Sequence, residues 1–267
     1  MAADGNDDMM DGDFIARRIL LTNDDGIDAP GLGALIDIAT TLAPEVWVVA
    51  PERDQSGTSH ALSLHDPLRV SQRGERRYGV TGTPGDCVVM GVRHLMAEQP
   101  PDLILSGVNR GANLGMETVF SGTVGAAMTG LLLGIPSIAL SQLFTRDQPV
   151  RWATARAVAP SVIREMVRLD WARDACLNIN FPDRSPEQVD GLVLTSQGTG
   201  LLGGASITAR TDPRNGAYHW LSLTRSSTTD DEGTETAAVL SGKVSVTPLR
   251  YERTDQGVLE RMRAAQV

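Results

Sequence analysis

The chain has 267 residues, of which 41% are hydrophobic and 21% charged, an ordinary composition for a folded protein. This composition excludes a wholly disordered chain and a low-complexity polymer. The net charge of −9 provides no basic surface for a nucleic-acid backbone, so duplex binding is not expected. The longest apolar stretch, residues 131–140, contains Gly134 and Pro136 and is shorter than the ~20 residues of a membrane span. We therefore expect no membrane segment.

The first 16 residues are predicted to form a mobile acidic tail, because five Asp and no basic residue fall in the first 13. This tail lacks the basic and apolar regions of a secretory signal. The two cysteines, Cys87 and Cys176, are too few for a disulfide framework and show no metal-ligand spacing. Both lie in apolar surroundings, so we expect a cytoplasmic protein with reduced, buried thiols.

Strand and helix patterns alternate along the first two thirds of the chain. Residues 18–22 form a continuous apolar run, typical of a strand buried on both faces, and turn residues 23–26 end it. A helical pattern over 31–42 and a second buried strand over 46–50 complete a βαβ unit with a right-handed crossover. Further strands are expected at 102–106, 137–140 and 176–180. Further helices are expected after a cap at Asp86, over 121–133 and over 152–169. The alternation predicts a three-layer α/β domain over residues 17–183.

The pattern weakens after residue 183. Strands are expected over residues 191–196 and 218–223, with a Gly-rich polar stretch between them. A short helix over 234–240 and a half-exposed strand over 244–248 follow. We therefore predict an α+β extension over residues 184–267, with a β-arm or hairpin that packs on a neighbouring subunit.

Oxygen-bearing side chains follow three of the expected strands. Asp24 and Asp25 follow the first strand, Ser56 lies in the loop after the second, and Asn109 follows the strand at 102–106. Ligands of open α/β sheets bind at these carboxyl ends. Two adjacent carboxylates repel without a cation, and with the amide and hydroxyl they would form an oxygen shell for Mg²⁺, Mn²⁺ or Ca²⁺ rather than Zn²⁺. The alternative is that the two aspartates only cap a helix and shape a turn.

Residues 121–123, Ser-Gly-Thr, open a predicted helix. A helix start offers free backbone N–H groups and the positive end of the dipole, and Gly122 would let a phosphate approach the backbone. The alternative is that Ser121 is a plain N-cap. The glycine-lined helix start at residues 82–86 has the same two interpretations.

A metal site beside an anion site indicates phosphoryl chemistry. The ion would polarise a phosphoryl oxygen and lower the pKa of a bound water. Asp24 or Asp25 could accept the proton of that water, which makes them the candidate catalytic residues. The sequence does not identify the acid that protonates the leaving alcohol.

Three other motifs carry less weight. Residues 198–203 match the dinucleotide-binding pattern G-x-G-x-x-G, but the residues after them do not continue as the helix which that mechanism requires. Residues 11–13, Asp-Gly-Asp, resemble a phosphatase nucleophile but follow no apolar strand. The four histidines show no ligand spacing, and His60, in the Ser56 loop, is expected to be a solvated surface residue.

Several long motifs together resemble the SurE family. They follow one another between residues 17 and 250, at residues 19–26, 50–57, 82–88, 106–115, 120–124, 177–180 and 244–249. The resemblance implies a Rossmann-like core and a swapped C-terminal arm in homodimers or homotetramers. It also implies a metal-dependent phosphatase, a 5'/3'-nucleotidase that acts on nucleoside monophosphates with one divalent ion, Mg²⁺ or Mn²⁺.

The resemblance also implies roles for single residues. The family's metal ligands fall on Asp24, Asp25, Ser56 and Asn109, which the strand ends had already indicated. Its phosphate-binding groups fall on Asn113, Ser121, Gly122 and Thr123. The chain departs from the family in its acidic N-terminal extension, its short C-terminal end and Lys243, where the family often has an aromatic residue. A nucleotide sensor without hydrolysis is the alternative function, and a cofactor-dependent oxidoreductase is a third.

Overall fold

The structure is a computed structural model that describes residues 14–169, 171, 174–225 and 231–266. The strands are β1 (Arg18–Thr22), β2 (Glu45–Pro51), β3 (Val70–Gly74), β4 (Arg77–Val80), β5 (Leu103–Arg110), β6 (Ser137–Gln142), β7 (Cys176–Phe181), β8 (Leu192–Leu194), β9 (Leu202–Thr211), β10 (Ala217–Arg225) and β11 (Val244–Leu249). The helices are α1 (Pro30–Ala39), α2 (Pro84–Met90), α3 (Gly122–Leu132), α4 (Trp152–Met166), α5 (Glu235–Leu240) and α6 (Gln256–Ala264). Shorter helical segments are η1 (Gly91–Leu95), η2 (Gly115–Val119) and η3 (Pro186–Gln188).

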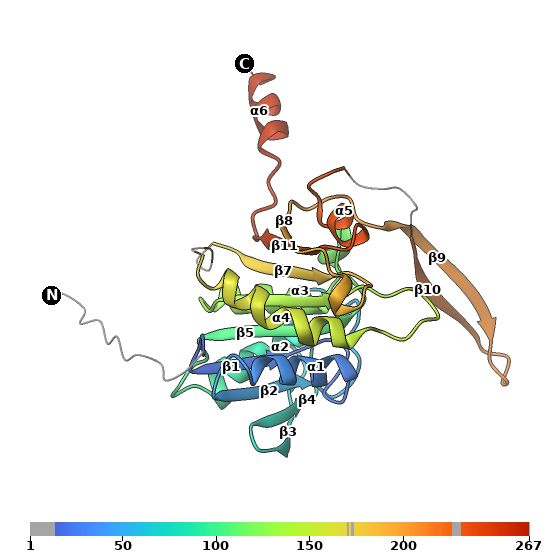
Figure 1. The fold of residues 1–267 in the computed structure, drawn as a ribbon. Coiled ribbons are helices and arrows are strands. Elements are labelled where there is room, and N and C mark those ends of the chain that lie inside the picture. The colour runs from blue at the N-terminus through green and yellow to red at the C-terminus, as the bar shows by residue number, and fades with distance from the viewer. Residues whose placement is uncertain (1–13, 170, 172–173, 226–230, 267) are drawn as a thin grey trace.

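A nine-stranded sheet of order β3-β4-β2-β1-β5-β6-β7-β11-β8 forms the middle layer. The central strands from β4 to β7 are parallel, and β3 and the β7–β11 pair are antiparallel. Helices α1 and α4 cover one face and α2 and α3 the other, as Figure 1 shows. The predicted three-layer, Rossmann-like α/β fold is therefore confirmed.

The sheet is built on both sides of one pair of strands. From β1 the chain extends through β2 and β4 toward one edge, and from β5 through β6 and β7 toward the other. The strand order therefore reverses between β1 and β5, where open α/β sheets bind ligands. Both strands are buried as continuous apolar runs, which is why the sequence pattern located them.

The described fold includes residues that the sequence analysis assigned to the acidic tail. Residues 1–13 of the expected acidic tail lie outside the described residues. The backbone N–H of Ile15, however, donates to the carbonyl of Leu42 at 2.9 Å, and Ala16 is buried in the core. The last residues of the predicted tail are thus part of the fold.

The C-terminal part of the chain returns to the central sheet. Strand β11 lies between β7 and β8, and residues 244–247 are buried instead of half-exposed as predicted, because β11 has a neighbour on each side. The antiparallel hairpin β9–β10 instead projects away from the body (Figure 1), and nearly all its residues are exposed.

The sequence also predicted the state of the thiols and a cap for α2. Cys87 and Cys176 are both free and buried, as expected. Asp86 does not cap the start of α2: Thr83 is the N-cap, and Asp86 accepts from the Thr83 backbone N–H at 2.8 Å in a capping box. Within the described part of the chain, no helix is both long and apolar enough to cross a membrane.

Candidate active site

A cavity of about 270 Å³ opens at the carboxyl ends of β1 and β5. We call it the oxygen pocket, because most of the polar side chains on its wall present oxygen atoms. Six of them are Asp24, Ser56, Asn109, Asn113, Glu117 and Ser121. The structure therefore gathers five of the predicted site residues around one space, although they come from separate segments of the chain.

Asp24 lies directly beyond β1 and is almost fully buried. The hydroxyl of Thr123 donates to its Oδ1 at 2.6 Å, and its own carbonyl accepts from the Gln55 backbone N–H at 2.7 Å. A Cβ on Gly122 would lie 2.8 Å from the Cβ of Asp24, so only glycine permits this approach. These contacts fix the carboxylate between the end of β1, the Ser56 loop and the start of α3.

The pKa of Asp24 is raised to about 6. Burial is the largest cause, the Thr123 hydroxyl opposes it, and the nearby charge of Asp25 raises the pKa further. The pKa of Asp25 is also raised, chiefly by burial, and its Oδ2 accepts from the Arg110 backbone N–H at 3.2 Å. Two neighbouring carboxyls are thus held where a positive charge would stabilise their ionised forms.

Asp25 faces a larger cavity beside the oxygen pocket, of about 950 Å³. Ser56, Arg110 and Arg225 line both spaces, so the two cavities adjoin. The Arg110 guanidinium lies 5.1 Å from the ring centre of Phe144, which lines the larger cavity. Arg110 lies within the motif at residues 106–115 but was not predicted as a site residue, and Arg225 lies in none of the motifs.

Asn109 lies inside β5, not beyond its end. The predicted strand stopped at residue 106, but β5 continues to Arg110 across a register shift against β6 between Ser106 and Asn109. Such an extra residue bends a strand and re-aims its side chains. The amide nitrogen of Asn109 donates to the Gly111 carbonyl at 2.9 Å, which leaves the amide oxygen as the atom for a ligand.

Ser121 and Thr123 lie at the start of α3, with different roles. Ser121 is the N-cap, because its hydroxyl accepts from the Val124 backbone N–H at 3.1 Å, and it also lines the oxygen pocket. The Thr123 hydroxyl is engaged with Asp24. Thr123 could therefore contact a phosphate through its backbone N–H, as Gly122 could. The two interpretations of Ser121, cap and anion site, are compatible.

Asn113 is buried in a network of amides. Its backbone N–H donates to Oδ1 of Asn180 at 2.8 Å, and its carbonyl accepts from the side chains of Asn178 and Asn180. Its Nδ2 donates to the Ser141 hydroxyl at 2.8 Å. The asparagines of β7 thus orient Asn113, which leaves its second amide N–H for a ligand.

The helix start at residues 82–86 is a cap and not an anion site. The Asp86 carboxylate accepts from the Thr83 backbone and from the N–H and hydroxyl of Ser63. A carboxylate already occupies this helix start, so it repels a phosphate. The G-x-G-x-x-G match at 198–203 leads into strand β9 and not into a helix, which removes its dinucleotide interpretation.

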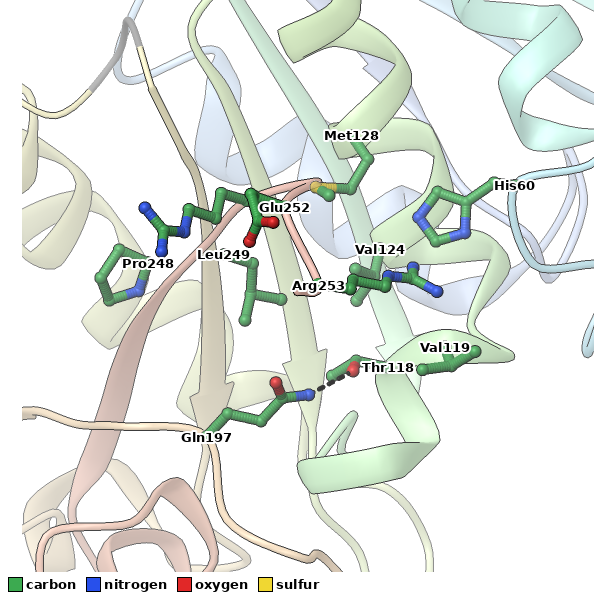
Figure 2. Close-up of a pocket in the computed structure, with 11 residues that line it drawn as sticks. His60, Thr118, Val119, Val124, Met128, Gln197, Pro248, Leu249, Glu252 and Arg253 are labelled. Atoms are coloured by element: carbon green, nitrogen blue, oxygen red, sulfur yellow. Dashed lines mark hydrogen bonds between the residues drawn. The ribbon is translucent and has the colours of Figure 1, made fainter. Parts of the chain in front are cut away.

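His60 is not the solvated surface residue that the sequence predicted. It is half-buried in a third cavity of about 430 Å³, beside Val124 and Met128 of α3 (Figure 2). Burial lowers the pKa of His60, and the nearby charge of Arg253 lowers it further. Neither Asp24 nor Ser56 lines this cavity, so it is separate from the oxygen pocket.

The donor set fits a hard cation. In the described residues no three or more His, Cys, Asp or Glu side chains cluster as a metal site. A site here would use two carboxylates with the amide and hydroxyl oxygens of Asn109 and Ser56. Oxygen-only sets of this kind suit Mg²⁺, Mn²⁺ or Ca²⁺.

A parallel sheet whose switch point combines carboxylates with a helix N-terminus defines an α/β protein that can bind a cation and an anion together. A family model described as "Survival protein SurE" matches residues 19–203. The chain belongs to the SurE family.

Individual relatives agree with this assignment. The chain is 59% identical over 248 residues to "5'-nucleotidase SurE 1" of Burkholderia lata, which covers 93% of this chain and 96% of that protein. It is 49% identical over 244 residues to "5'-nucleotidase SurE" of Bradyrhizobium sp. strain ORS 278, covering 90% and 95% respectively. The crystal structure of the SurE protein from Aquifex aeolicus superposes with a TM-score of 0.79 at 35% identity, covering 94% of this chain and 100% of that one.

Proposed function

We propose that this chain hydrolyses nucleoside monophosphates to nucleoside and phosphate, and that the reaction takes place in the oxygen pocket. The chain is a phosphatase of the 5'-nucleotidase kind, as its family and the names of its relatives indicate. The observation that supports the location is the meeting of Asp24, Asn109 and Ser121 on one cavity wall at the strand switch point.

Metal dependence goes with the family in general terms. In this chain Asp24, Asp25, Ser56 and Asn109 would hold one divalent ion, and their oxygen atoms favour Mg²⁺ or Mn²⁺. The raised pKa of Asp24 supports this assignment, since a buried carboxyl without a cation holds its proton to a higher pH than an exposed one. A bound ion would polarise a phosphoryl oxygen and lower the pKa of a water molecule.

The chain's own groups position the phosphate. The backbone N–H groups of Gly122 and Thr123 lie at the start of α3, which is the positive end of the helix dipole, and they can donate to an anion bound there. Asn113, oriented by the β7 asparagines, lines the same pocket and offers an amide N–H. Asp25, which is half-buried and less constrained than Asp24, accepts the proton of the attacking water.

The outer wall of the pocket suits a nucleoside. Phe120, Leu202 and Leu223 give it apolar surface, and Arg225 gives it a positive charge. The larger adjoining cavity holds the Arg110–Phe144 pair, a flat surface on which a base can stack. The preference for one base, and for the 5'- or the 3'-phosphate, belongs to this region.

We also propose that the protein is a cytoplasmic homodimer or homotetramer. Two buried, free cysteines are consistent with a reducing compartment. The exposed apolar side chains of the β9–β10 hairpin, Ile207, Tyr218, Trp220, Leu221 and Leu223, favour contact with a second copy.

The test is release of free phosphate from AMP by the purified chain with Mn²⁺ or Mg²⁺, before and after treatment with a chelator. We expect turnover that the chelator abolishes and added metal restores. Asp24→Asn should lower kcat at least 100-fold, because it removes a charged ligand of the ion that would polarise the phosphoryl oxygen. Asp66→Asn, at an exposed loop position, is the matched control. A stable AMP complex without phosphate release would favour the sensor, and near wild-type turnover by Asp24→Asn would refute the site.

A further inference from the structure

The oxygen pocket contains a second carboxyl that the proposed metal site does not use. Glu117 lies in η2, the short helix directly before the Ser121 turn, and it lines the pocket together with Asp24, Asn113 and Ser121. Among the described residues on that wall, Asp24 and Glu117 are the two carboxyls. The two come from different elements, one from the end of β1 and the other from η2.

The backbone around Glu117 is held firmly. The Gly115 backbone N–H donates to Oε1 of Glu235 at 2.6 Å, and the Gly115 carbonyl accepts from Thr118 and Gln197. The Glu117 backbone N–H donates to the Leu114 carbonyl at 3.1 Å, and its carbonyl accepts from Phe120. The η2 backbone is therefore fixed while the half-buried Glu117 side chain faces the pocket.

The half-buried position of Glu117 shifts its carboxyl toward the protonated form. Burial raises the pKa of Glu117, and Arg225 at the base of the hairpin opposes this effect. The other charged side chains on the pocket wall are Asp24 and Arg110. A carboxyl that retains its proton closer to neutral pH is able to donate it.

The reaction requires such a donor. As the water oxygen bonds to phosphorus, the bond from phosphorus to the nucleoside oxygen breaks, and its electron pair passes to that oxygen. A nucleoside alkoxide is a poor leaving group unless it is protonated as it departs. The attacking and leaving oxygens lie roughly in line, so a group on a wall other than that of the attacking water can reach the leaving one.

We propose that Glu117 is the general acid that protonates the leaving oxygen of the nucleoside, an inference that rests on the proposed function. The proton passes from the Glu117 carboxyl to the nucleoside oxygen and leaves a carboxylate. The proton of the attacking water passes to Asp25. Exchange with solvent restores both groups after the products, nucleoside and phosphate, depart.

Two substrates separate this role from a structural one. Nitrophenolate leaves p-nitrophenyl phosphate readily without protonation, whereas the nucleoside of AMP does not. Glu117→Gln, assayed with saturating Mn²⁺, should lower kcat for AMP by roughly 100-fold or more and kcat for p-nitrophenyl phosphate by less than about threefold. The fall of kcat for AMP at high pH, where Glu117 loses its proton, should disappear in the variant. Glu98→Gln, at an exposed position, should leave both rates unchanged.

The outcomes are distinguishable. Equal loss with both substrates would make Glu117 a structural or phosphate-binding residue and would overturn the inference, as would an unchanged rate with AMP. A partial recovery of AMP turnover in Glu117→Asp would support it. If the wild-type chain releases phosphate from neither substrate, the proposed function itself fails, and the inference fails with it.

Discussion

The carboxyl of Asp24 combines two properties that rarely occur together: it is 3% exposed, and its neighbour along the chain is a second carboxyl. The fold tolerates this arrangement because the Thr123 hydroxyl donates to it. One hydrogen bond does not compensate a buried charge, so the pKa of Asp24 stays at about 6. The charge of the Asp24 carboxylate is therefore incompletely compensated until a cation binds.

The raised pKa of Asp24 predicts that the stability of the metal-free chain depends on pH. The pKa of Asp24 is about 6 in the folded state against 3.8 as reference, so the folded state binds more protons between those values. The free energy of unfolding should therefore fall as pH rises from about 4 through about 6, by up to about 3 kcal/mol. Urea unfolding of the chelated protein at pH 4 and pH 7.5 measures it.

Two comparisons test that assignment. Asp24→Asn should lose most of the pH dependence and be more stable than the wild type at pH 7.5 without metal. Added Mn²⁺ should stabilise the wild type more than the variant, since a ligand stabilises the state that binds it. Equal pH dependence in both proteins would contradict the assignment to Asp24.

Gly122 lies so close to Asp24 that it has no room for a larger side chain. A Cβ on Gly122 would lie 2.8 Å from Cβ and 3.1 Å from Oδ2 of Asp24, whereas a Cβ on Gly33 of α1 meets nothing within 4 Å. Gly122→Ala should displace the carboxylate and lower kcat at least about tenfold, because misplaced catalytic groups lose rate steeply. Gly33→Ala should leave kcat unchanged and raise stability by about 0.5–1 kcal/mol.

Phosphate release and urea unfolding of both glycine variants supply the measurement. A Gly122→Ala protein with wild-type kcat would show that Asp24 can move without loss of function.

At the scale of elements, α5 is hydrogen-bonded to two segments that border the site, η2 and the loop before β9. Glu235 is fully buried at its first turn and accepts from the backbone N–H of Gly115 at 2.6 Å and of Gly198 at 2.8 Å. One side chain thus holds η2 and the loop before β9 together. The glycines of this loop serve the same contact, since a Cβ on Gly200 would lie 2.4 Å from the Leu114 carbonyl.

Glu235→Gln should therefore destabilise the protein. The substitution replaces one accepting oxygen by an NH₂ group that faces a backbone N–H, at a cost of about 1.5–3 kcal/mol, the range for hydrogen bonds to charged groups. Denaturant unfolding measures the change, and Glu232→Gln, at an exposed position nearby, serves as control. Equal stability of the two variants would contradict a fastening role for Glu235.

The sequence predicted the elements whose residues are apolar and buried. Strands β1, β2, β6 and β7 and helices α1, α3 and α4 lie where the patterns placed them. Strands β3 and β4 were missed because they are short and contain few apolar residues, and β9 was missed because its Gly-rich start has no apolar alternation. Helix α6 was missed as well, and it has no buried residues.

Some residues of the candidate site could be predicted from the sequence, and others could not. Asp24, Ser56 and Asn109 could be predicted, because strand ends in a parallel sheet meet at one edge. Glu117 and Arg225 could not, since a short 3₁₀ helix and the base of a hairpin reach the pocket only through tertiary contacts. No local pattern encodes such contacts.

At the scale of the whole molecule, the β9–β10 hairpin is the exceptional part. An isolated two-stranded hairpin is marginally stable in water, and this one exposes 62% of Trp220 and 67% of Leu221. Its shape, extended away from the body (Figure 1), offers little contact with its own core. A second copy of the chain is the partner we propose for it.

The hairpin therefore predicts the assembly state. The wild type should sediment as a dimer or tetramer, and the double variant Trp220→Ser with Leu221→Ser should shift toward the monomer at equal concentration. Leu64→Ser removes a side chain that is 80% exposed on the body and should leave the mass unchanged. Analytical ultracentrifugation measures all three, and a wild-type monomer would refute the proposed assembly.

The base of this hairpin also lines the oxygen pocket, through Leu202, Leu223 and Arg225. Contact of a second copy with the projecting tip would then be coupled to the pocket in which we propose that the nucleoside binds. Thermodynamic linkage makes such a coupling mutual, so nucleotide would tighten subunit association as much as association tightens nucleotide. Dilution would then weaken substrate affinity, a behaviour that a self-contained catalytic cleft does not show.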